Sequence, residues 1–382
     1  MAWQKVWTPV SSFAKRPLLT VTIFALAASA LQAMPRRLKF GVERFETAKE
    51  RYKPTHRRGV AECKVVLAWE AKRWELGIFE EKLKGLARVV PATGNRLLEE
   101  IVDAEVAVGR LPDEAVMAAR RLKFVQAPWA GVDGFNLELL KRKGVMLASA
   151  KGCNARTVAE HALALMLALA KRVVFLNERV KGGGWVPWSE ETFLDDLEGK
   201  TLVILGYGNI GRELARMCKC LGMHVIGVRR QPAEPDEYAE RVAGLAELEE
   251  VVGNADFLVV TLPLTPETRG VVSRRVLKAM KPTAYLVNVG RGAVVDEEAL
   301  YEALTEGWIA GAALDVWWSY PPDPNAPSRL GVHKLPNVIA TPHKAGWTRE
   351  SRRRCMEFAA ENAARYLKGE KPLNVVDYDN PY

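Results

Sequence analysis

The stretch LGYGNIGREL at residues 205–214 constrains the fold of this chain more than any other segment. Its glycines, Gly206, Gly208 and Gly211, follow an apolar run at 202–205 and precede a helix-forming run at 210–221. In that context the first glycine permits a tight turn, the second lets the backbone approach a pyrophosphate, and the third allows close helix–strand packing. Free N–H groups at the start of the helix would face the phosphates. The segment therefore predicts a strand–turn–helix unit that binds a dinucleotide.

Short apolar runs alternate with helical sequence along the rest of the chain, which predicts parallel α/β sheets. Strands are expected within 63–70, 87–92, 104–110, 122–133 and 144–150, and after the glycine turn within 223–228, 255–264, 283–292, 309–318 and 337–346. The stretch 155–180 has no Gly or Pro and is apolar on more than one face. It predicts one long helix, buried between domains or subunits.

The composition fits an ordinary globular protein with two domains, since 48% of the 382 residues are hydrophobic and 26% charged. Much of the positive charge lies in residues 35–59 and is not spread over a folded face with stacking aromatics, so no nucleic-acid binding is predicted. The five cysteines, an odd number without a C-x-x-C pair, predict reduced structural thiols and no metal site. His161 has no second ligand at metal spacing and is expected to be packed.

Residues 1–59 are expected to form a basic extension outside the folded domains. The apolar run at 18–33 follows basic residues and ends in small ones, as a secretory signal or a membrane anchor does. It is short for a span, and a start at Met34 or an organelle transit segment are the alternatives. We expect a cytoplasmic protein that meets a membrane only if residues 17–34 form an anchor.

Several motifs together resemble the D-isomer-specific 2-hydroxyacid dehydrogenases. They are GYGNIG, TLPLTPET, NVGRG, GAALDVWW and TPHKAGWT, preceded by APWAGVDGFN and NARTVAEHALALMLALAKR. The resemblance covers residues 60–375 and implies two Rossmann-like domains. A nucleotide-binding domain at 156–345 is inserted in a discontinuous, flavodoxin-like substrate domain formed by 60–155 and 346–382. The resemblance also implies a homodimer.

Potentially reactive side chains follow the later strands, where ligands bind in an open α/β sheet. Reduction of a 2-keto acid needs a cation for the carboxylate and an acid for the carbonyl oxygen. Arginine offers a planar bidentate donor, and histidine is readily poised as an acid near neutral pH. The resemblance assigns these roles to Arg291 and His343. It also implies that the substrate carboxylate accepts hydrogen bonds from the backbone N–H groups of Ala130, Gly131 and Val132.

The cofactor site is expected to hold NADP(H) in preference to NAD(H). NAD-specific relatives carry an acidic residue at the end of the second strand, where this chain has Arg229 and Arg230. A guanidinium can bind a 2′-phosphate but cannot accept a hydrogen bond from a ribose hydroxyl. The alternative is that both arginines point into solvent. The resemblance places Asp315 beside the nicotinamide carboxamide, and the expected cofactor-binding residues are Gly206, Gly208, Asn209, Ile210, Gly211, Arg229, Arg230, Thr261, Pro263, Val289 and Asp315.

One position departs from the family pattern, which usually has a glutamate five residues after the aspartate to hydrogen-bond the histidine. Here that position holds Tyr320, with Asp323 as an alternative partner for His343. The sequence thus predicts an oxidoreductase that transfers a hydride between NAD(P)H and a small 2-keto or 2-hydroxy acid of the glyoxylate or hydroxypyruvate type. The alternatives are a formate- or phosphite-type dehydrogenase of the same superfamily and a nucleotide-sensing protein similar to the C-terminal-binding corepressors, which keep the full Arg–Glu–His set.

Overall fold

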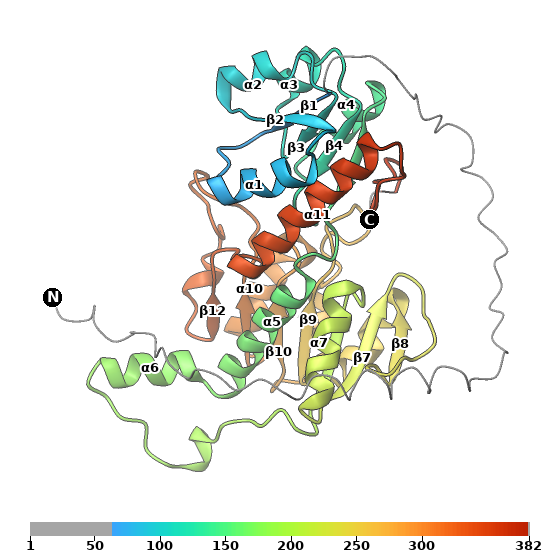
Figure 1. Ribbon diagram of the computed structural model, residues 1–382. Helices are drawn as coiled ribbons and strands as arrows, with labels where there is room; N and C mark the ends of the chain where they lie inside the picture. Colours follow the sequence, from blue (N-terminus) through green and yellow to red (C-terminus); the bar gives the residue numbers. More distant parts are fainter. Residues whose placement is uncertain (1–62, 381–382) are drawn as a thin grey trace, which may run out of the picture. The chain divides into compact units, whose positions relative to one another are not determined.

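The computed structural model describes residues 63–380, which form two parallel β-sheets with covering helices (Figure 1). The predicted basic extension at 1–59 and its apolar run lie outside the described residues. Within 63–380, none of the helices combines the length and the apolar character needed to cross a bilayer. The two sheets confirm the predicted α/β class.

The first sheet has the order β2-β1-β3-β4-β5, the flavodoxin-like arrangement. Its strands are β1 (Cys63–Leu67), β2 (Ala87–Pro91), β3 (Val106–Val108), β4 (Phe124–Ala127) and β5 (Met146–Ser149). They are short, mostly apolar and largely buried, as expected for a parallel sheet covered on both faces. The segment around Val375 returns to this sheet, forming an antiparallel bridge with Ala148.

The second sheet has the order β12-β11-β10-β9-β6-β7-β8. Its strands are β6 (Thr201–Leu205), β7 (His224–Arg229), β8 (Arg241–Gly244), β9 (Phe257–Val260), β10 (Tyr285–Asn288), β11 (Gly311–Leu314) and β12 (Val338–Ala340). The strand order reverses between β6 and β9, so the glycine turn after β6 lies at the switch point where ligands bind in open sheets. The sequence did not predict β8, which is only four residues long.

The helices connect and cover the strands. They are α1 (Arg73–Lys82), α2 (Gly94–Glu100), α3 (Asp113–Ala118), α4 (Leu137–Arg142), α5 (Ala155–Ala170), α6 (Val173–Lys181), α7 (Asn209–Cys220), α8 (Leu248–Val252), α9 (Arg274–Ala279), α10 (Glu297–Thr305) and α11 (Arg349–Leu367). Although α11 is the last helix, it packs beside α1 and β4 of the first sheet, as the red helix of Figure 1 shows. The helices α5 and α7 pack against each other.

The single long helix predicted over 155–180 is wrong. The chain forms α5 and then α6, with Arg172 between them in the left-handed conformation at φ 46°. The carbonyl of Ala170 accepts a hydrogen bond from the backbone N–H of Asp195, 3.0 Å away, instead of serving a continued helix. The Arg172 guanidinium lies over the Phe175 ring, 4.7 Å from its centroid. Within the single chain, α5 is largely buried whereas α6 has no buried residue.

The prediction that all cysteines are reduced is contradicted by a disulfide between Cys153 and Cys355. Cys153 lies in the turn before α5 and Cys355 lies within α11, 202 residues later in the sequence. Their Cα atoms are 5.2 Å apart, a normal separation for a disulfide. Sequence spacing alone gives no information about such a distant pair. The other cysteines, Cys63, Cys218 and Cys220, are free thiols.

Candidate active site

The glycine turn after β6 has the steric properties of a nucleotide cradle. Gly206 has φ +110°, and a Cβ there would lie 2.7 Å from the Thr261 hydroxyl. That hydroxyl donates to the Gly206 carbonyl at 2.7 Å and so fixes the turn. A Cβ on Gly211 would lie 2.7 Å from the Gly206 carbonyl oxygen, whereas one on Gly208 would meet no described atom within 4 Å. The turn is therefore packed on its protein side and open where a ligand would approach, next to the start of α7 at Asn209.

A tyrosine inside the glycine motif anchors the loop that follows β7. The Tyr207 ring covers Gly227, where a Cβ would lie 2.5 Å from the ring. Its hydroxyl donates to Asp236 at 2.8 Å, and burial of the phenol raises its pKa. Asp236 also forms an ion pair with Arg212 at 3.2 Å. Arg229, the last residue of β7, and Arg230 precede this anchored loop, and both are exposed.

The positive charge of Arg230 contributes to a lowered pKa of the Glu267 carboxylate. The Thr265 hydroxyl is the main cause of its lowered pKa, and the charge of Arg230 contributes at longer range. Glu267 belongs to the TLPLTPET motif, and its side chain is exposed. Positive charge at the end of β7 thus lies within electrostatic reach of one carboxylate, but Arg230 makes no ion pair within the described residues.

Arg291 is held at the carboxyl end of β10 by Asn288. The Asn288 amide donates to the Arg291 carbonyl at 3.0 Å and accepts from the Gly290 N–H at 3.1 Å. The side chain reaches across to the loop after β4, where Nη2 lies 2.9 Å from Oδ1 of Asp133 and Nε 3.4 Å from Oδ2. A Cβ on Gly131 would lie only 2.2 Å from Nη2 of Arg291. A glycine is therefore required for this approach.

The backbone around Gly131 offers hydrogen-bond donors to the same space. The N–H groups of Ala130, Gly131 and Val132 donate no hydrogen bond to any described residue. The turn is fixed by its flanks, because the Trp129 carbonyl accepts from the Ala150 N–H at 2.9 Å and the Val132 carbonyl from the Phe135 N–H at 3.0 Å. Three unpaired N–H groups beside a guanidinium form an arrangement suited to an anion.

His343 lies in a loop that a buried carboxylate holds in place. Asp315 is fully buried and accepts hydrogen bonds from the Thr341 hydroxyl at 2.6 Å and the N–H groups of Lys344 and Ala345 at 2.8 Å each. Both Asp315 oxygens accept hydrogen bonds from the loop, and the expected contact of Asp315 with a nicotinamide carboxamide stays a prediction. His161, expected to be packed, lies 3.3 Å from the Thr341 hydroxyl.

The ionisation of His343 is set mainly by desolvation. Surrounding protein atoms lower its pKa below the ordinary value, and the positive charge of Arg291 lowers it further. Asp315 and Asp133 act in the opposite direction but do not reverse the shift. These effects place His343, Arg291 and Asp133 within electrostatic reach of one another.

The Tyr320 ring lies beside the His343 ring at a tilt, and the two side chains form no hydrogen bond with each other. The ring centroids are 5.5 Å apart with a tilt of 36°, and the phenol oxygen accepts from the Trp317 N–H at 3.2 Å. Asp323, the alternative partner, accepts from the Asn325 N–H at 2.8 Å, and no contact with His343 occurs within the described residues. In the part of the chain that the structure describes, no carboxylate is therefore hydrogen-bonded to the His343 ring.

Sequence reasoning missed a group of aromatic and charged side chains beside this loop. Arg352 lies over the rings of Trp69 and Trp347, 5.7 and 5.6 Å from their centroids. It forms an ion pair of 2.8 Å with Glu75, whose buried carboxylate also accepts from the Trp69 indole at 3.1 Å. The members come from the β1–α1 segment and α11, with Trp347 four residues after His343. No local motif links residues so far apart.

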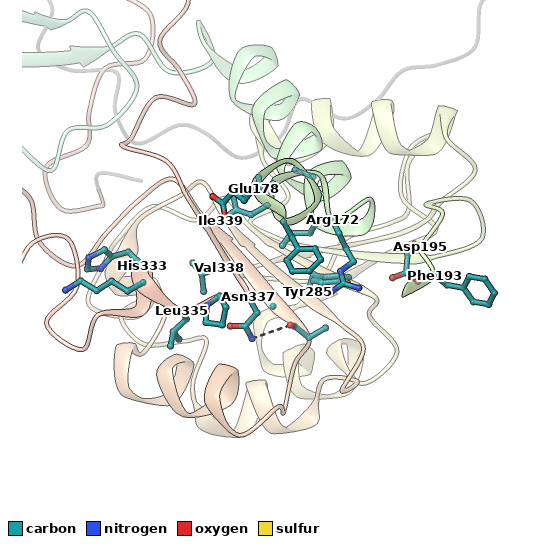
Figure 2. A pocket seen from close by; sticks show the side chains of 18 residues that line it. Arg172, Glu178, Phe193, Asp195, Tyr285, His333, Leu335, Asn337, Val338 and Ile339 are labelled. Carbon is teal, nitrogen blue, oxygen red and sulfur yellow. Dashed lines mark hydrogen bonds between the residues drawn. The ribbon is translucent and has the colours of Figure 1, made fainter. Parts of the chain in front are cut away.

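A separate hollow of about 570 Å³ lies away from the candidate residues described above, at the amino ends of β10, β11 and β12 (Figure 2). Tyr285, Gly311 and Val338, the first residues of β10, β11 and β12, line it together with Arg172 and other residues of the α5–α6 segment. Arg291 follows the opposite end of β10, and the glycine turn follows the carboxyl end of β6 in the same parallel sheet. The catalytic candidates are therefore not in this hollow. Within residues 63–380, no group of His, Cys, Asp or Glu side chains is arranged to hold a metal ion.

The chain is similar in sequence and in fold to known proteins. The family model described as D-isomer specific 2-hydroxyacid dehydrogenase, NAD binding domain, matches residues 163–345. A glyoxylate reductase of Korarchaeum cryptofilum is 37% identical over 298 residues, covering 76% of this chain and 87% of the relative. Glyoxylate/hydroxypyruvate reductase B of Pectobacterium carotovorum is 40% identical over 272 residues, covering 70% and 83%. An NADPH-dependent glyoxylate/hydroxypyruvate reductase of Sinorhizobium meliloti, solved with NADP and malonate, matches with a TM-score of 0.69 and 25% identity over 84% of this chain and 98% of that one.

Proposed function

Since this chain belongs to the D-isomer-specific 2-hydroxyacid dehydrogenase family, whose enzymes are nicotinamide-dependent oxidoreductases of hydroxy acids, we propose that it reduces small 2-keto acids of the glyoxylate or hydroxypyruvate type. In this proposal the substrate domain comprises residues 60–155 and 346–382, and the nucleotide domain comprises 156–345. The K. cryptofilum and P. carotovorum relatives described above are named glyoxylate reductase and glyoxylate/hydroxypyruvate reductase B, which supports this choice of substrate.

The observation that carries the proposal is the meeting of Arg291 with the loop at 130–132. The guanidinium lies against Gly131, next to backbone N–H groups that donate to no described residue. A planar guanidinium and converging N–H groups can hold a 2-keto acid by its carboxylate. His343, whose pKa responds to Arg291, is then the proposed acid for the carbonyl oxygen two bonds away from that carboxylate carbon.

The cradle after β6 fits the phosphates of a dinucleotide, because Gly208 is open to an approaching ligand and the first N–H groups of α7, which begins at Asn209, have no partner within the helix. A bound nicotinamide supplies the hydride for reduction. We assign cofactor contacts to the cradle and the neighbouring loops: Gly206, Gly208, Asn209, Ile210, Gly211, Arg229, Arg230, Thr261, Pro263 and Val289. For Asp315 we propose the role of positioning residue of the His343 loop, in view of its three hydrogen bonds there, and contact with the nicotinamide carboxamide is the alternative role.

The chain's own residues manage the proton and the charge. Arg291 holds the carboxylate and keeps the keto carbon at a fixed place relative to His343. His343 donates its proton to the oxygen that becomes the hydroxyl, and it takes a proton back when the reaction runs as an oxidation. Tyr320 covers one face of the imidazole without neutralising its charge.

We propose NADP(H) as the preferred cofactor, on the exposed pair Arg229 and Arg230 at the end of β7. The S. meliloti structure, an NADPH-dependent reductase, agrees with this preference. Arg229 is the last residue of β7, so the preference is tested first at Arg229.

The test is a panel of reactions followed by absorbance of the reduced nicotinamide. Glyoxylate and hydroxypyruvate with NADPH are expected to be reduced, and Arg291→Leu should lower kcat/KM by roughly a hundredfold or more, since hydrogen bonds to charged groups contribute about 1.5–3 kcal/mol each. Oxidation of formate or phosphite, with no reduction of any 2-keto acid, would instead establish the alternative activity. Nucleotide binding without turnover on the whole panel would favour a sensing role.

We also propose a homodimer, formed through α6 and the segment that follows it. Exposed apolar side chains gather there, including Val180 at 56%, Trp185 at 77%, Trp188 at 97% and Phe193 at 74% of their full exposure. Such a concentration of exposed aromatic side chains is typical of an association surface. Phe193 also lines the hollow of Figure 2. Light scattering should give twice the chain mass, and a Trp188→Ser, Phe193→Ser variant should shift toward monomer.

A further inference from the structure

The Nε–Nη2 edge of Arg291 already holds a carboxylate from the protein itself. Asp133 meets Nη2 at 2.9 Å and Nε at 3.4 Å, while Nη1 donates to the Gly290 carbonyl at 2.8 Å. This side-by-side pairing of two nitrogens with two oxygens is the geometry in which a guanidinium binds a substrate carboxylate. We propose that Asp133 is an internal competitor for the substrate-carboxylate position on Arg291, which a bound 2-keto acid must displace.

The pairing joins residues carried by different sheets. Asp133 belongs to the turn after β4, and Arg291 follows β10, 158 residues later. Their side chains retain 47% and 29% of their exposure, so the pair is open to exchange with a dissolved anion. A partly exposed ion pair typically changes an equilibrium by a factor of only about 1.4 to 5. An incoming carboxylate that also accepts hydrogen bonds from the N–H groups at 130–132 can therefore replace Asp133 on Arg291.

A second cation lies ready for the displaced carboxylate. Arg110, two residues after β3, places its guanidinium against Gly134, where an added Cβ would lie 3.4 Å from the guanidinium carbon. Gly134 is the residue next to Asp133. Arg110 is exposed and makes no ion pair within residues 63–380. Among residues 63–380, Asp133 would thus pair with Arg291 when the site is empty and with Arg110 when substrate holds Arg291.

The inference rests on the proposed function, in which Arg291 binds the substrate carboxylate, and it makes Asp133 a competitor of the substrate that never touches the reacting atoms. Its effect belongs to binding and not to the chemical step. Removing its charge should therefore change KM and leave kcat nearly unchanged. A residue that held Arg291 in a productive orientation would act in the opposite direction, because its loss would raise KM.

The first experiment compares the Asp133→Asn variant with the wild-type protein, both as the full-length chain. The KM for glyoxylate and the calorimetric Kd for oxalate, both with saturating NADPH, should fall by about 1.4- to 5-fold. Asp133→Ala should shift both in the same direction. Glu138→Gln, which removes an exposed negative charge from the first turn of α4, is the matched control and should leave both unchanged. A higher KM or an unaltered oxalate Kd in Asp133→Asn would overturn the proposal.

The second experiment is a double-mutant cycle with Arg110→Gln. This substitution should raise the KM and the oxalate Kd when Asp133 is present, because the displaced carboxylate loses its second partner. It should have no effect in the Asp133→Asn background. An equal increase in both backgrounds would show that Arg110 acts on the ligand directly, and the two-cation exchange would be wrong. If wild-type protein reduces no 2-keto acid, the proposed function fails, whereas oxalate binding still tests the Asp133–Arg291 competition.

Discussion

The proposed acid, His343, combines a left-handed backbone with a ring that is poorly solvated. Its φ is 56°, and desolvation together with Arg291 lowers its pKa. Reduction needs the protonated ring, so its rate should decline as pH rises through this lowered pKa, whereas oxidation is favoured above it. The usual glutamate partner would oppose this shift, but Tyr320 occupies its position in the sequence.

Changing Tyr320 to Glu should raise the pKa of His343, because a carboxylate beside the ring stabilises the imidazolium. The alkaline limb of the reductive pH profile should move upward by roughly one unit. Initial rates of NADPH oxidation across pH provide the measurement. Tyr320→Phe is the control, and it should leave the limb in place because the phenol oxygen bonds to the Trp317 N–H and not to the histidine. An unmoved limb in the Glu variant would direct attention to Asp323.

The cofactor preference can be tested at Arg229. Arg229→Asp should move the preference from NADPH toward NADH, since a carboxylate repels the 2′-phosphate and accepts hydrogen bonds from ribose hydroxyls. The loss for NADPH should be on the order of 1.5–3 kcal/mol, or roughly ten- to a hundredfold in affinity. Fluorescence titration with both nucleotides measures it. Equal NADPH/NADH ratios in the variant and the wild type would mean that Arg229 points into solvent.

At the scale of elements, the loop at 341–346 depends on a carboxylate from the neighbouring strand end. Asp315 follows β11, and its oxygens accept hydrogen bonds from the Thr341 hydroxyl and from the N–H groups of Lys344 and Ala345. Replacing a buried carboxylate acceptor leaves donors unpaired, at a cost of about 1–3 kcal/mol. The loop that carries His343 is thus positioned by the second sheet itself.

Asp315→Asn should therefore lower kcat and thermal stability together. It should also shift the alkaline limb of the reductive profile downward, because the charge of Asp315 raises the pKa of His343. This shift is opposite in sign to that expected for Tyr320→Glu. The Kd for NADPH should change little, since both carboxylate oxygens are engaged by the loop. A large loss of NADPH affinity with an unchanged pH profile would restore the carboxamide role.

Elements were predictable where the pattern was local. The alternating apolar runs located most strands and the glycine turn, and the family resemblance, together with the chemistry of arginine and histidine, singled out Arg291 and His343. Two features could not be inferred in this way. The break at Arg172 depends on a tertiary hydrogen bond between Ala170 and Asp195, and the pairing of Arg291 with Asp133 joins segments far apart in sequence. The roles of the proposed site residues remain predictions for the experiments above.

At the scale of the whole molecule, the disulfide closes a very long loop. Cys153 and Cys355 are 202 residues apart, and the link joins the turn before α5 to α11. In the chain-entropy account, closing a loop of this size stabilises the folded state by about 2–5 kcal/mol. A Cys153→Ser, Cys355→Ser variant should lose that amount in denaturant titrations under oxidising conditions. Cys220→Ser, an exposed free thiol, is the control. Equal unfolding free energies would show that the link adds nothing.

The distribution of the candidate residues between the two sheets has an evolutionary consequence. Arg291, His343 and Asp315 all belong to the second sheet and its loops, whereas Trp69, Arg110 and the turn at 130–134 follow strands of the first. The residues for proton transfer and the residues for substrate choice therefore lie on different sheets and can change independently. Substitutions in the first-sheet loops can tune the protein toward a new acid while the reactive pair stays intact, so laboratory selection for new substrates should accumulate its mutations there.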